Sequence, residues 1–344
     1  MNAVREPAEP SGPRRRGFVL RYRSVAPPAL SIVVPSRDTR ALTIRCLASI
    51  EAAARVADSE IILVDDGSGD DTAAEVRVRF PGVRVVRHEV PRGFTAAANT
   101  GLRLASGAVR LLLNSDTELR PGGLDVLIEA FDADPSLGIA GAQLAYPDGA
   151  AQWSGGRAPG LAWLFAEASG LAGALARLPG YRRLRPLDRR ADRDVDWVTG
   201  AALAMRRDVW EAVGPLDEAF GLYGQDLDFC LRAGDRGWRV RIAAGFRVLH
   251  HHGATVARVF GRPGRQHVPA KWTDLRRWAE KRRGPAYARR VAWAIAAGAA
   301  LRLAGRRVLT PAVPAPRRDR WLGETHELRL ALAALRASVP AGRT

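Results

Sequence analysis

Short apolar segments alternate with helical segments through the first third of the chain, and this alternation limits the possible folds more than any other feature. Apolar runs and stretches with helical spacing follow one another at 30–34, 39–56, 60–64, 71–80, 83–87, 93–104 and 109–113. Strands that alternate with helices predict a mostly parallel sheet covered by helices on both faces. We therefore expect an α/β fold, with the first strand stopped by Pro35.

The rest of the chain divides by composition. Residues 1–28 are rich in Pro and Arg and predict a loose leader. The alternation weakens after about residue 140, and a charged linker at 181–194 precedes a second dense segment. We expect one domain over 29–260 and a basic helical tail over 261–344.

Positive charge is concentrated at one end of the chain. The net charge is +17, and residues 271–344 hold 17 Lys and Arg against 5 Asp and Glu. A basic tail favours an attachment surface over a groove for nucleic acid, and no nucleic-acid motif is present. A dinucleotide oxidoreductase is excluded as well, because 35–38 lacks the glycine-rich turn that should follow the first strand.

Several features predict a cytoplasmic location. Cys46 and Cys230 lie far apart and suggest neither a disulfide framework nor a metal cluster. No apolar segment follows the basic residues at 14–16, so no secretory signal is expected. The longest apolar run near the C-terminus, 291–301, has about half of the roughly 20 residues that a spanning helix needs.

Polar clusters follow three of the expected strands, at 35–37, 65–67 and 114–116. Ligands of parallel sheets bind at the carboxyl ends of the strands. Asp65 and Asp66 can accept hydrogen bonds from a nucleoside, although the same residues are common in plain turns. Asp116 can hold Mg²⁺ or Mn²⁺ together with two phosphates, or it can simply cap the strand.

Two further clusters carry groups suited to acid–base chemistry or metal binding. Residues 224–232 look like a helix start with acidic residues at its positive end, and one carboxylate there can act as a general base. Three histidines at 250–252 follow an apolar segment and can supply a metal ligand or fill a structural role.

The order of these clusters resembles family 2 glycosyltransferases over roughly residues 30–255. The matching motifs are SIVVP at 31–35, VDDGS at 64–68, RGF at 92–94 with Asn99 and Gly101, LNSDT at 113–117, VTGAA at 198–202, VGPLDE at 213–218 and QDLDFCLR at 225–232 with Gly237-Trp238. Within that family the chain is similar to rhamnosyltransferase-like enzymes of cell-surface polysaccharide synthesis.

The resemblance implies a GT-A fold, with a nucleotide half at 29–140 and an acceptor half at 141–260, and inverting transfer of a sugar from a nucleotide-diphosphate sugar with Mg²⁺ or Mn²⁺. It assigns Asp226 as the catalytic base and Asp116 and His250 to the metal. The implied donor-binding residues are Pro35, Ser36, Arg37, Asp65, Asp66, Arg92, Gly93, Asn99, Asn114 and Ser115. The implied acceptor-binding residues are Trp153, Trp197, Gly200, Gln225 and Asp228, where the two tryptophans either stack on sugars or belong to the core.

Two positions depart from the family pattern. Asn114 replaces the first acid of the usual Asp-x-Asp motif, and Gln225 stands where the family usually has Glu. An amide can hydrogen-bond an acceptor but cannot take its proton. These two positions permit an alternative, a non-catalytic protein that binds nucleotide sugars.

The tail suggests one more partner. Residues 271–307 combine Trp272, Trp278, Tyr287 and Trp293 with eleven Lys and Arg. A basic aromatic helix can insert its apolar stripe into the headgroup layer of an anionic membrane, which suits a lipid-linked acceptor at the inner face of the cell membrane. The alternative is a pair of helices packed against the catalytic domain.

Overall fold

The computed structural model describes residues 28–53, 59–175, 178, 191–251, 253 and 267–338. The leader, most of the charged linker and the expected boundary at 260–261 lie outside these residues. The strands are β1 (Leu30–Ser36), β2 (Ser59–Asp65), β3 (Arg84–Arg87), β4 (Val109–Leu113), β5 (Thr117–Leu119), β6 (Leu137–Ala145), β7 (Gly155–Gly156), β8 (Arg193–Asp194), β9 (Trp197–Val198), β10 (Ala202–Arg206) and β11 (Arg239–His250). The helices are α1 (Arg40–Ala53), α2 (Thr72–Arg79), α3 (Phe94–Leu104), α4 (Gly123–Ala133), α5 (Leu161–Ser169), α6 (Ala172–Leu175), α8 (Arg207–Val213), α9 (Gln225–Gly234), α11 (Val268–Leu309), the 3-10 helix η1 (Thr310–Ala312) and α12 (Ala315–Ala337).

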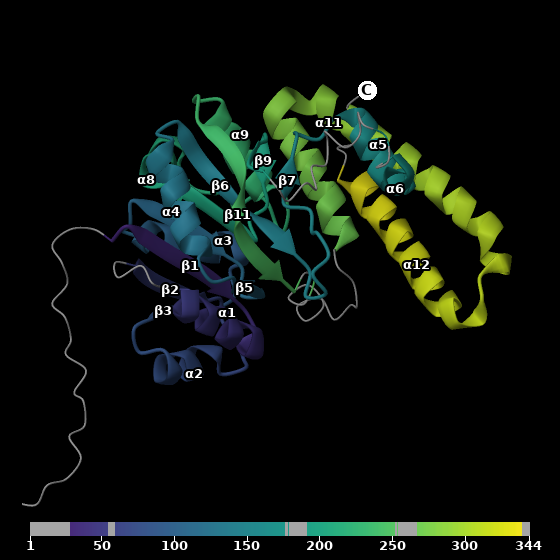
Figure 1. Ribbon diagram of the computed structural model, residues 1–344. Coiled ribbons are helices and arrows are strands. Elements are labelled where there is room, and N and C mark those ends of the chain that lie inside the picture. Colours follow the sequence, from purple (N-terminus) through teal and green to yellow (C-terminus); the bar gives the residue numbers. More distant parts are fainter. Residues whose placement is uncertain are drawn as a thin grey trace, which may run out of the picture.

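The central sheet has the strand order β3-β2-β1-β4-β10-β6-β11-β5, and β8 pairs with β11 (Figure 1). Strands β1 to β4, β6 and β11 run in one direction, whereas β5, β8 and β10 run in the other. The prediction of a mostly parallel sheet flanked by helices is therefore confirmed. Strand β10 enters the sheet antiparallel, so its first residues lie at the edge where the parallel strands end.

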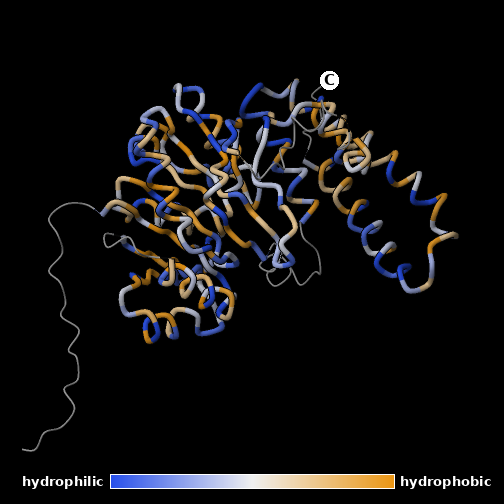
Figure 2. The backbone as a smooth tube through the Cα atoms, in the orientation of Figure 1, coloured by the Kyte–Doolittle hydropathy of each residue, from blue (hydrophilic) through white to orange (hydrophobic). Residues whose placement is uncertain are grey.

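Two hydrophobic clusters cover the two faces of this sheet. Ile32 and Val34 of β1 pack on the face covered by α1, α2 and α4, and Val33 packs on the face covered by α3, α8 and α9. Figure 2 shows the hydrophobic colouring along these strands. Because successive side chains of a strand point to opposite faces, a strand buried on both sides needs an unbroken apolar run. That is the pattern seen in the sequence.

The end of the first strand differs from the prediction. Strand β1 continues through Pro35 to Ser36, and Pro35 is paired with Val64 of β2. Pairing of β1 with β4 ends two residues earlier, at Val33. Proline is tolerated where a strand is paired on only one side, because its missing N–H removes no bond there. The prediction that Pro35 stops the strand was wrong.

The C-terminal helices form a layer of their own on one side of the sheet (Figure 1). Helix α11 is broken at Gly284, whose φ is +80°, immediately before Pro285. The helix packs against α5 and α12 in a third hydrophobic cluster. Trp272 and Trp278 are only 5% and 3% exposed within that cluster. Two of the four aromatic residues that were expected to face a membrane are therefore buried in the protein. For these two, the structure agrees with the alternative of helices packed against the catalytic domain.

Among the helices that the structure describes, none is long and apolar enough to cross a membrane.

Candidate active site

A cavity of about 640 Å³ opens at the edge of the sheet where the parallel strands end. Its walls come from the ends of β1, β4, β6 and β11, from the start of α3 and α9, and from the first turns of α11. Most of the predicted site residues line it, namely Pro35, Ser36, Arg37, Asp66, Gly93, Asn114, Ser115, Asp116, Trp153, Trp197, Gly200, Gln225, Asp226 and His250. The structure places Asp65, Arg92, Asn99 and Asp228 outside this lining.

The two neighbouring aspartates after β2 differ in what they contact. Asp65 turns away from the cavity, where its carboxylate accepts hydrogen bonds from the Arg87 side chain at 2.7 Å and the Ser68 N–H at 3.2 Å. Asp66 lies on the cavity wall and accepts the backbone N–H groups of Arg92 and Gly93, each at 2.8 Å. The Arg92 side chain is exposed. Asp66 thus fixes the loop that starts α3, and Arg92 contributes its backbone.

A buried cluster of hydroxyl groups joins two of the predicted polar clusters. Thr39 lies at 3.1 Å from both the Ser36 and the Ser115 hydroxyl, and Ser36 also contacts Thr43 at 2.7 Å. The end of β1 is therefore linked to the loop after β4. Within the described residues, the buried Asn114 Oδ1 has no hydrogen-bond partner.

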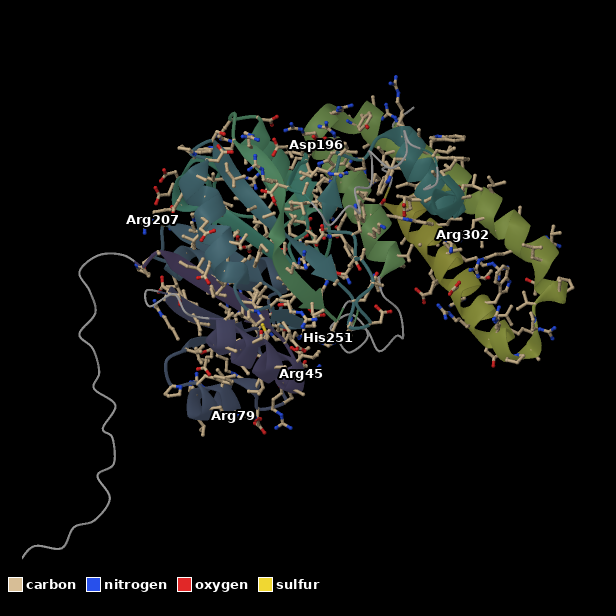
Figure 3. All side chains as sticks on the ribbon, viewed as in Figure 1. Arg45, Arg79, Asp196, Arg207, His251 and Arg302 are labelled. Carbon is tan, nitrogen blue, oxygen red and sulfur yellow. The ribbon has the colours of Figure 1, made fainter. Side chains whose placement is uncertain are left out.

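The predicted metal ligands meet at the end of β11. His250 Nε2 lies 3.3 Å from Asp116 Oδ1, and both side chains are buried. His250 Nδ1 lies 2.6 Å from the Gln152 Oε1 atom, so a proton on Nδ1 satisfies that contact. The next histidine, His251, contacts Glu118 at 2.7 Å instead and is labelled beside Arg45 in Figure 3. Only the first of these two histidines lines the cavity.

This arrangement fits a divalent cation bound jointly with a ligand. With the proton on Nδ1, His250 Nε2 and the Asp116 carboxylate oxygen are two potential metal ligands only 3.3 Å apart. A carboxylate and an imidazole are two protein ligands only, and magnesium-type sites complete their shell with phosphates and water. In the described part of the chain, no three His, Cys, Asp or Glu side chains cluster as an all-protein metal site would require.

Asp226 stands in the first turn of α9, where the helix begins after Gly224. Its Oδ2 accepts the Gly200 N–H at 2.9 Å, and its Oδ1 accepts the Leu227 N–H at 2.8 Å. Burial raises the pKa of the Asp226 carboxyl, and these backbone N–H groups offset part of the rise. The carboxylate is therefore fixed in orientation and holds a proton more readily than an ordinary aspartate.

The residues beside Asp226 have separate roles. Gln225 lines the cavity, and its Oε1 is buried without a hydrogen-bond partner in the described structure. Asp228 points the other way, into ion pairs with Arg232 at 2.8 Å and Lys281 at 2.9 Å. Asp228 therefore ties α9 to α11, and it does not reach the cavity.

Three tryptophans form one wall of the cavity. Trp153 lies against Trp163 with ring centroids 5.4 Å apart and against Trp197 at 5.2 Å, the latter pair edge to face. Trp153 and Trp197 were predicted from the sequence, and Trp163 was missed. Its position on α5, two residues into an apolar helix, gave no signal that distinguishes it from a core residue.

The first turns of α11 contribute a wall that the sequence did not reveal. Asp274 is buried and lines the cavity together with Lys271 and Leu275. Its carboxylate accepts the backbone N–H groups of Leu222 and Tyr223, both at 3.1 Å. The predicted tail is thus part of the site.

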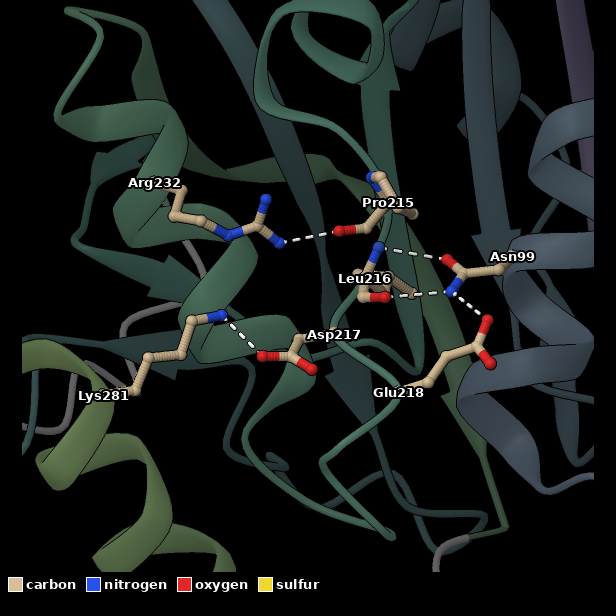
Figure 4. Close-up of a pocket in the computed structure, with 7 residues that line it drawn as sticks. All are labelled: Asn99, Pro215, Leu216, Asp217, Glu218, Arg232 and Lys281. Atoms are coloured by element: carbon tan, nitrogen blue, oxygen red, sulfur yellow. Dashed lines mark hydrogen bonds and ion pairs between the residues drawn. The ribbon is translucent and has the colours of Figure 1, made fainter.

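Asn99 lines a second, smaller cavity of about 380 Å³ between α3, the loop at 215–218 and Arg232 of α9 (Figure 4). Its side chain donates to the Leu216 carbonyl at 2.9 Å and accepts the Leu216 N–H at 3.0 Å. It also donates to Glu218 at 2.8 Å. These contacts join α3 to the loop before α9, which is the structural role of Asn99.

The fold and the site together define the class of protein. A mostly parallel sheet presents acidic side chains at its carboxyl edge, and a fixed carboxylate on α9 faces the same cavity. This is the architecture of a glycosyltransferase with the GT-A fold.

Comparison with known proteins gives the family. The protein-family model described as Glycosyl transferase family 2 matches residues 31–212 of the sequence, more than half of the chain. The chain belongs to glycosyl transferase family 2.

Two curated relatives show how far this similarity extends. The chain is 30% identical to the O-antigen biosynthesis protein RfbC of Myxococcus xanthus, over 73% of this chain and 19% of that protein. It is also 30% identical to the N-acetylglucosaminyl-diphospho-decaprenol L-rhamnosyltransferase of Mycobacterium tuberculosis, over 62% of this chain and 73% of that protein. The chain thus spans about a fifth of the length of the first relative.

Solved structures share the fold. The mannosyltransferase PcManGT from Pyrobaculum calidifontis, in complex with GDP-Man and Mn²⁺, superposes with a TM-score of 0.55 at 16% identity and covers 92% of this chain and 88% of its own. GalNAc-T7 with UDP, GalNAc and Mn²⁺ gives 0.51 at 17% identity, over 65% of this chain and 43% of that one.

Proposed function

We propose that this protein transfers a sugar from a nucleoside-diphosphate sugar to an acceptor hydroxyl, with inversion at the anomeric carbon. The observation that carries the proposal is the Asp226 carboxylate on the cavity wall, oriented by the Gly200 and Leu227 N–H groups. Its raised pKa suits a general base, because such a group accepts a proton more readily during the reaction.

The reaction needs one base and one leaving group. The acceptor oxygen attacks the anomeric carbon from the face opposite the diphosphate, and the bond between that carbon and the diphosphate oxygen breaks. The hydroxyl proton moves to the Asp226 carboxylate, and the nucleoside diphosphate departs with the bonding electrons. Gln225 Oε1 can accept a hydrogen bond from a second acceptor hydroxyl and so orient the sugar.

The leaving diphosphate requires positive charge. Asp116 and His250 would hold Mg²⁺ or Mn²⁺, with Asn114 as a neighbouring oxygen donor. The bound cation would neutralise the charge that develops on the diphosphate. Gln152 would hold the His250 ring in the tautomer with its proton on Nδ1, in which Nε2 can act as the ligand. Both solved structures named above contain Mn²⁺, which supports divalent metal use in this fold.

Donor and acceptor are proposed to bind on opposite sides of Asp226. Pro35, Ser36, Arg37 and Asp66 would contact the nucleoside and its phosphates at the ends of β1 and β2. The tryptophan wall formed by Trp153, Trp163 and Trp197 would stack on acceptor sugars, since sugar rings present apolar C–H faces.

The names of the relatives suggest the biological setting. One is an O-antigen biosynthesis protein, and the other transfers rhamnose to a sugar carried on a lipid diphosphate. We propose a role in the synthesis of a cell-surface polysaccharide or glycolipid, with a glycan or lipid-linked acceptor and a cytoplasmic location at the inner face of the membrane.

A panel of nucleotide sugars tests the activity. Donors that raise the melting temperature are incubated with Mn²⁺, with Mg²⁺ or with a chelator, and released nucleoside diphosphate is measured. We expect slow donor hydrolysis with metal, because water can replace a missing acceptor. Binding of a donor without any turnover, even with candidate acceptors present, would favour the non-catalytic sugar-nucleotide-binding protein.

A further inference from the structure

The second half of α11 carries an apolar stripe that no other part of the described structure covers. Trp293 and Val308 are each 77% exposed, and Leu301 between them is exposed as well. Exposed alanines fill the intervening positions of the same face, at 297, 300 and 304. Spacings of three and four residues place all of these side chains in one line along the helix.

Packing already accounts for the opposite face of this helix. Val291, Ile295 and Ala299 are buried against α5 and α12 in the third hydrophobic cluster. The helix is therefore apolar on two sides, and only one of them contributes to the core. Exposed apolar stripes of this length indicate contact with a partner.

Positive charge borders the stripe. The segment 285–309 contains five arginines and no acidic residue. Arg289, Arg290 and Arg307 are exposed. The helical angle of 100° per residue places Arg289 and Arg307 along one margin of the stripe and Arg290 in line with it, at its N-terminal end. Arg306 is used internally, since it stacks on Trp321 with the guanidinium 4.1 Å from the ring and donates to the Trp321 carbonyl.

The helical pair that carries the stripe extends away from the α/β layers. Figure 1 shows the second half of α11 and α12 side by side, with their connecting turn at the far end. Exposed Val308 and Leu309 lie just before this turn, and exposed Leu322 follows it. Three more exposed arginines, Arg317, Arg318 and Arg320, stand on the first turns of α12. The turn therefore combines apolar and basic groups at a protruding end.

We infer that this surface, the line from Trp293 to Val308 with its bordering arginines, binds an anionic phospholipid membrane. Trp, Leu and Val would enter the boundary between headgroups and acyl chains, and the arginines would contact lipid phosphates. A second copy of the chain is a poorer fit. In a two-fold contact the same patch would face itself and bring arginines together without acidic partners. The inference deepens the proposed membrane setting but rests on this surface, not on the active site.

Vesicle sedimentation of the full-length protein without any substrate tests the inference. We expect binding to vesicles of phosphatidylcholine mixed with phosphatidylglycerol, little binding to phosphatidylcholine alone, and release by salt. Arg289→Gln with Arg290→Gln should weaken binding about thirty-fold, from two contributions of the size that a basic residue makes near an anionic surface. Arg77→Gln with Arg84→Gln is the matched control and should leave binding unchanged, because these exposed residues lie on α2 and β3.

The apolar part of the surface has its own variant. Trp293→Gln with Val308→Gln should abolish most of the binding, whereas Val78→Gln, at a position on α2 that is 81% exposed, should not. Melting temperatures check that each variant is folded. The inference fails if the parent protein does not bind anionic vesicles. It also fails if Trp293→Gln with Val308→Gln binds them as well as Val78→Gln does. It also fails if the parent forms a dimer that Trp293→Gln dissociates while vesicles are not bound. Because no donor is present, these outcomes do not depend on whether the proposed activity is correct.

Discussion

The carboxylate of Asp274 accepts the backbone N–H of Leu222 at 3.1 Å, although the two residues are 52 positions apart in the sequence. The same carboxylate accepts the N–H of Tyr223, whose hydroxyl in turn accepts the His267 N–H at 2.9 Å. The loop that leads into α9 and Asp226 is thus held by the second turn of α11. That helix is a structural part of the candidate active site.

Asp274→Ala should lower the turnover number more than it changes the KM for the donor. The substitution leaves the partly buried N–H groups of Leu222 and Tyr223 without this acceptor, which costs about 1 kcal/mol of folding stability. The loop before Asp226 then loses its fixed position, while the donor side of the cavity is untouched. Steady-state kinetics and thermal unfolding of the same samples measure both effects.

Asp274→Asn is the matching conservative variant, because its amide oxygen can still accept one of the N–H groups. It should recover part of the turnover and keep the pH profile of the parent protein. A purely structural role would show equal losses in stability for both variants with kinetics unchanged.

The activity should fall at acid pH, with a midpoint above the pKa of an ordinary aspartate. Asp226 acts as a base only when deprotonated, and burial raises its pKa from the usual 3.8. The rate therefore rises with pH through the raised pKa. Gln225→Glu should move this acid limb further toward neutral pH, since a second carboxylate beside Asp226 disfavours its charged form. If the acid limb of the pH profile had its midpoint at the pKa of an ordinary aspartate, and Gln225→Glu did not shift it, the assignment of Asp226 as the base would be contradicted.

Asp116→Ala should remove the effect of Mn²⁺ on the binding of a nucleoside diphosphate and leave binding of the nucleoside largely intact. Titration calorimetry with and without Mn²⁺ measures the difference. Gln152→Leu should weaken the Mn²⁺ effect about 10- to 100-fold, because it releases the His250 ring.

Glu118→Gln is the control for these metal-site variants, since Glu118 contacts the neighbouring His251, whose side chain lies outside the cavity. Donor binding and activity that persist without any divalent ion would remove Asp116 from the metal role.

The sequence predicted the alternating strands and helices from β1 to β4 well for a physical reason. A strand buried on both faces needs an unbroken apolar run, and β4 has the predicted bounds, Val109–Leu113. Polar residues directly after such runs have to lie at one edge of a parallel sheet, so Asp66, Asn114 and Asp116 converge as expected. The sequence could not separate Asp65 from Asp66, because only the turn after β2 decides which carboxylate faces the cavity.

The tail shows where local patterns stop being informative. Trp278 and Trp293 stand in similar basic, apolar surroundings, yet one is buried against neighbouring helices and the other is exposed. The difference arises from packing with α5, which lies more than 100 residues earlier, and with α12, which folds back along α11. Asp274 was missed for the same reason, since its partners are the N–H groups of a distant loop.

The central claim is that Asp226 takes the proton of the acceptor hydroxyl, and one comparison tests it most directly. Turnover of the best donor is measured for the parent protein, for Asp226→Asn and for Asp228→Asn, with donor binding measured in parallel. Asp226→Asn should bind donor normally and lose about 10²-fold or more in turnover, the scale of general-base catalysis. Asp228→Asn should lower the melting temperature by weakening the link to Lys281 and keep most of its turnover once folded. Near-normal turnover of Asp226→Asn, or a larger loss in folded Asp228→Asn, would contradict this account.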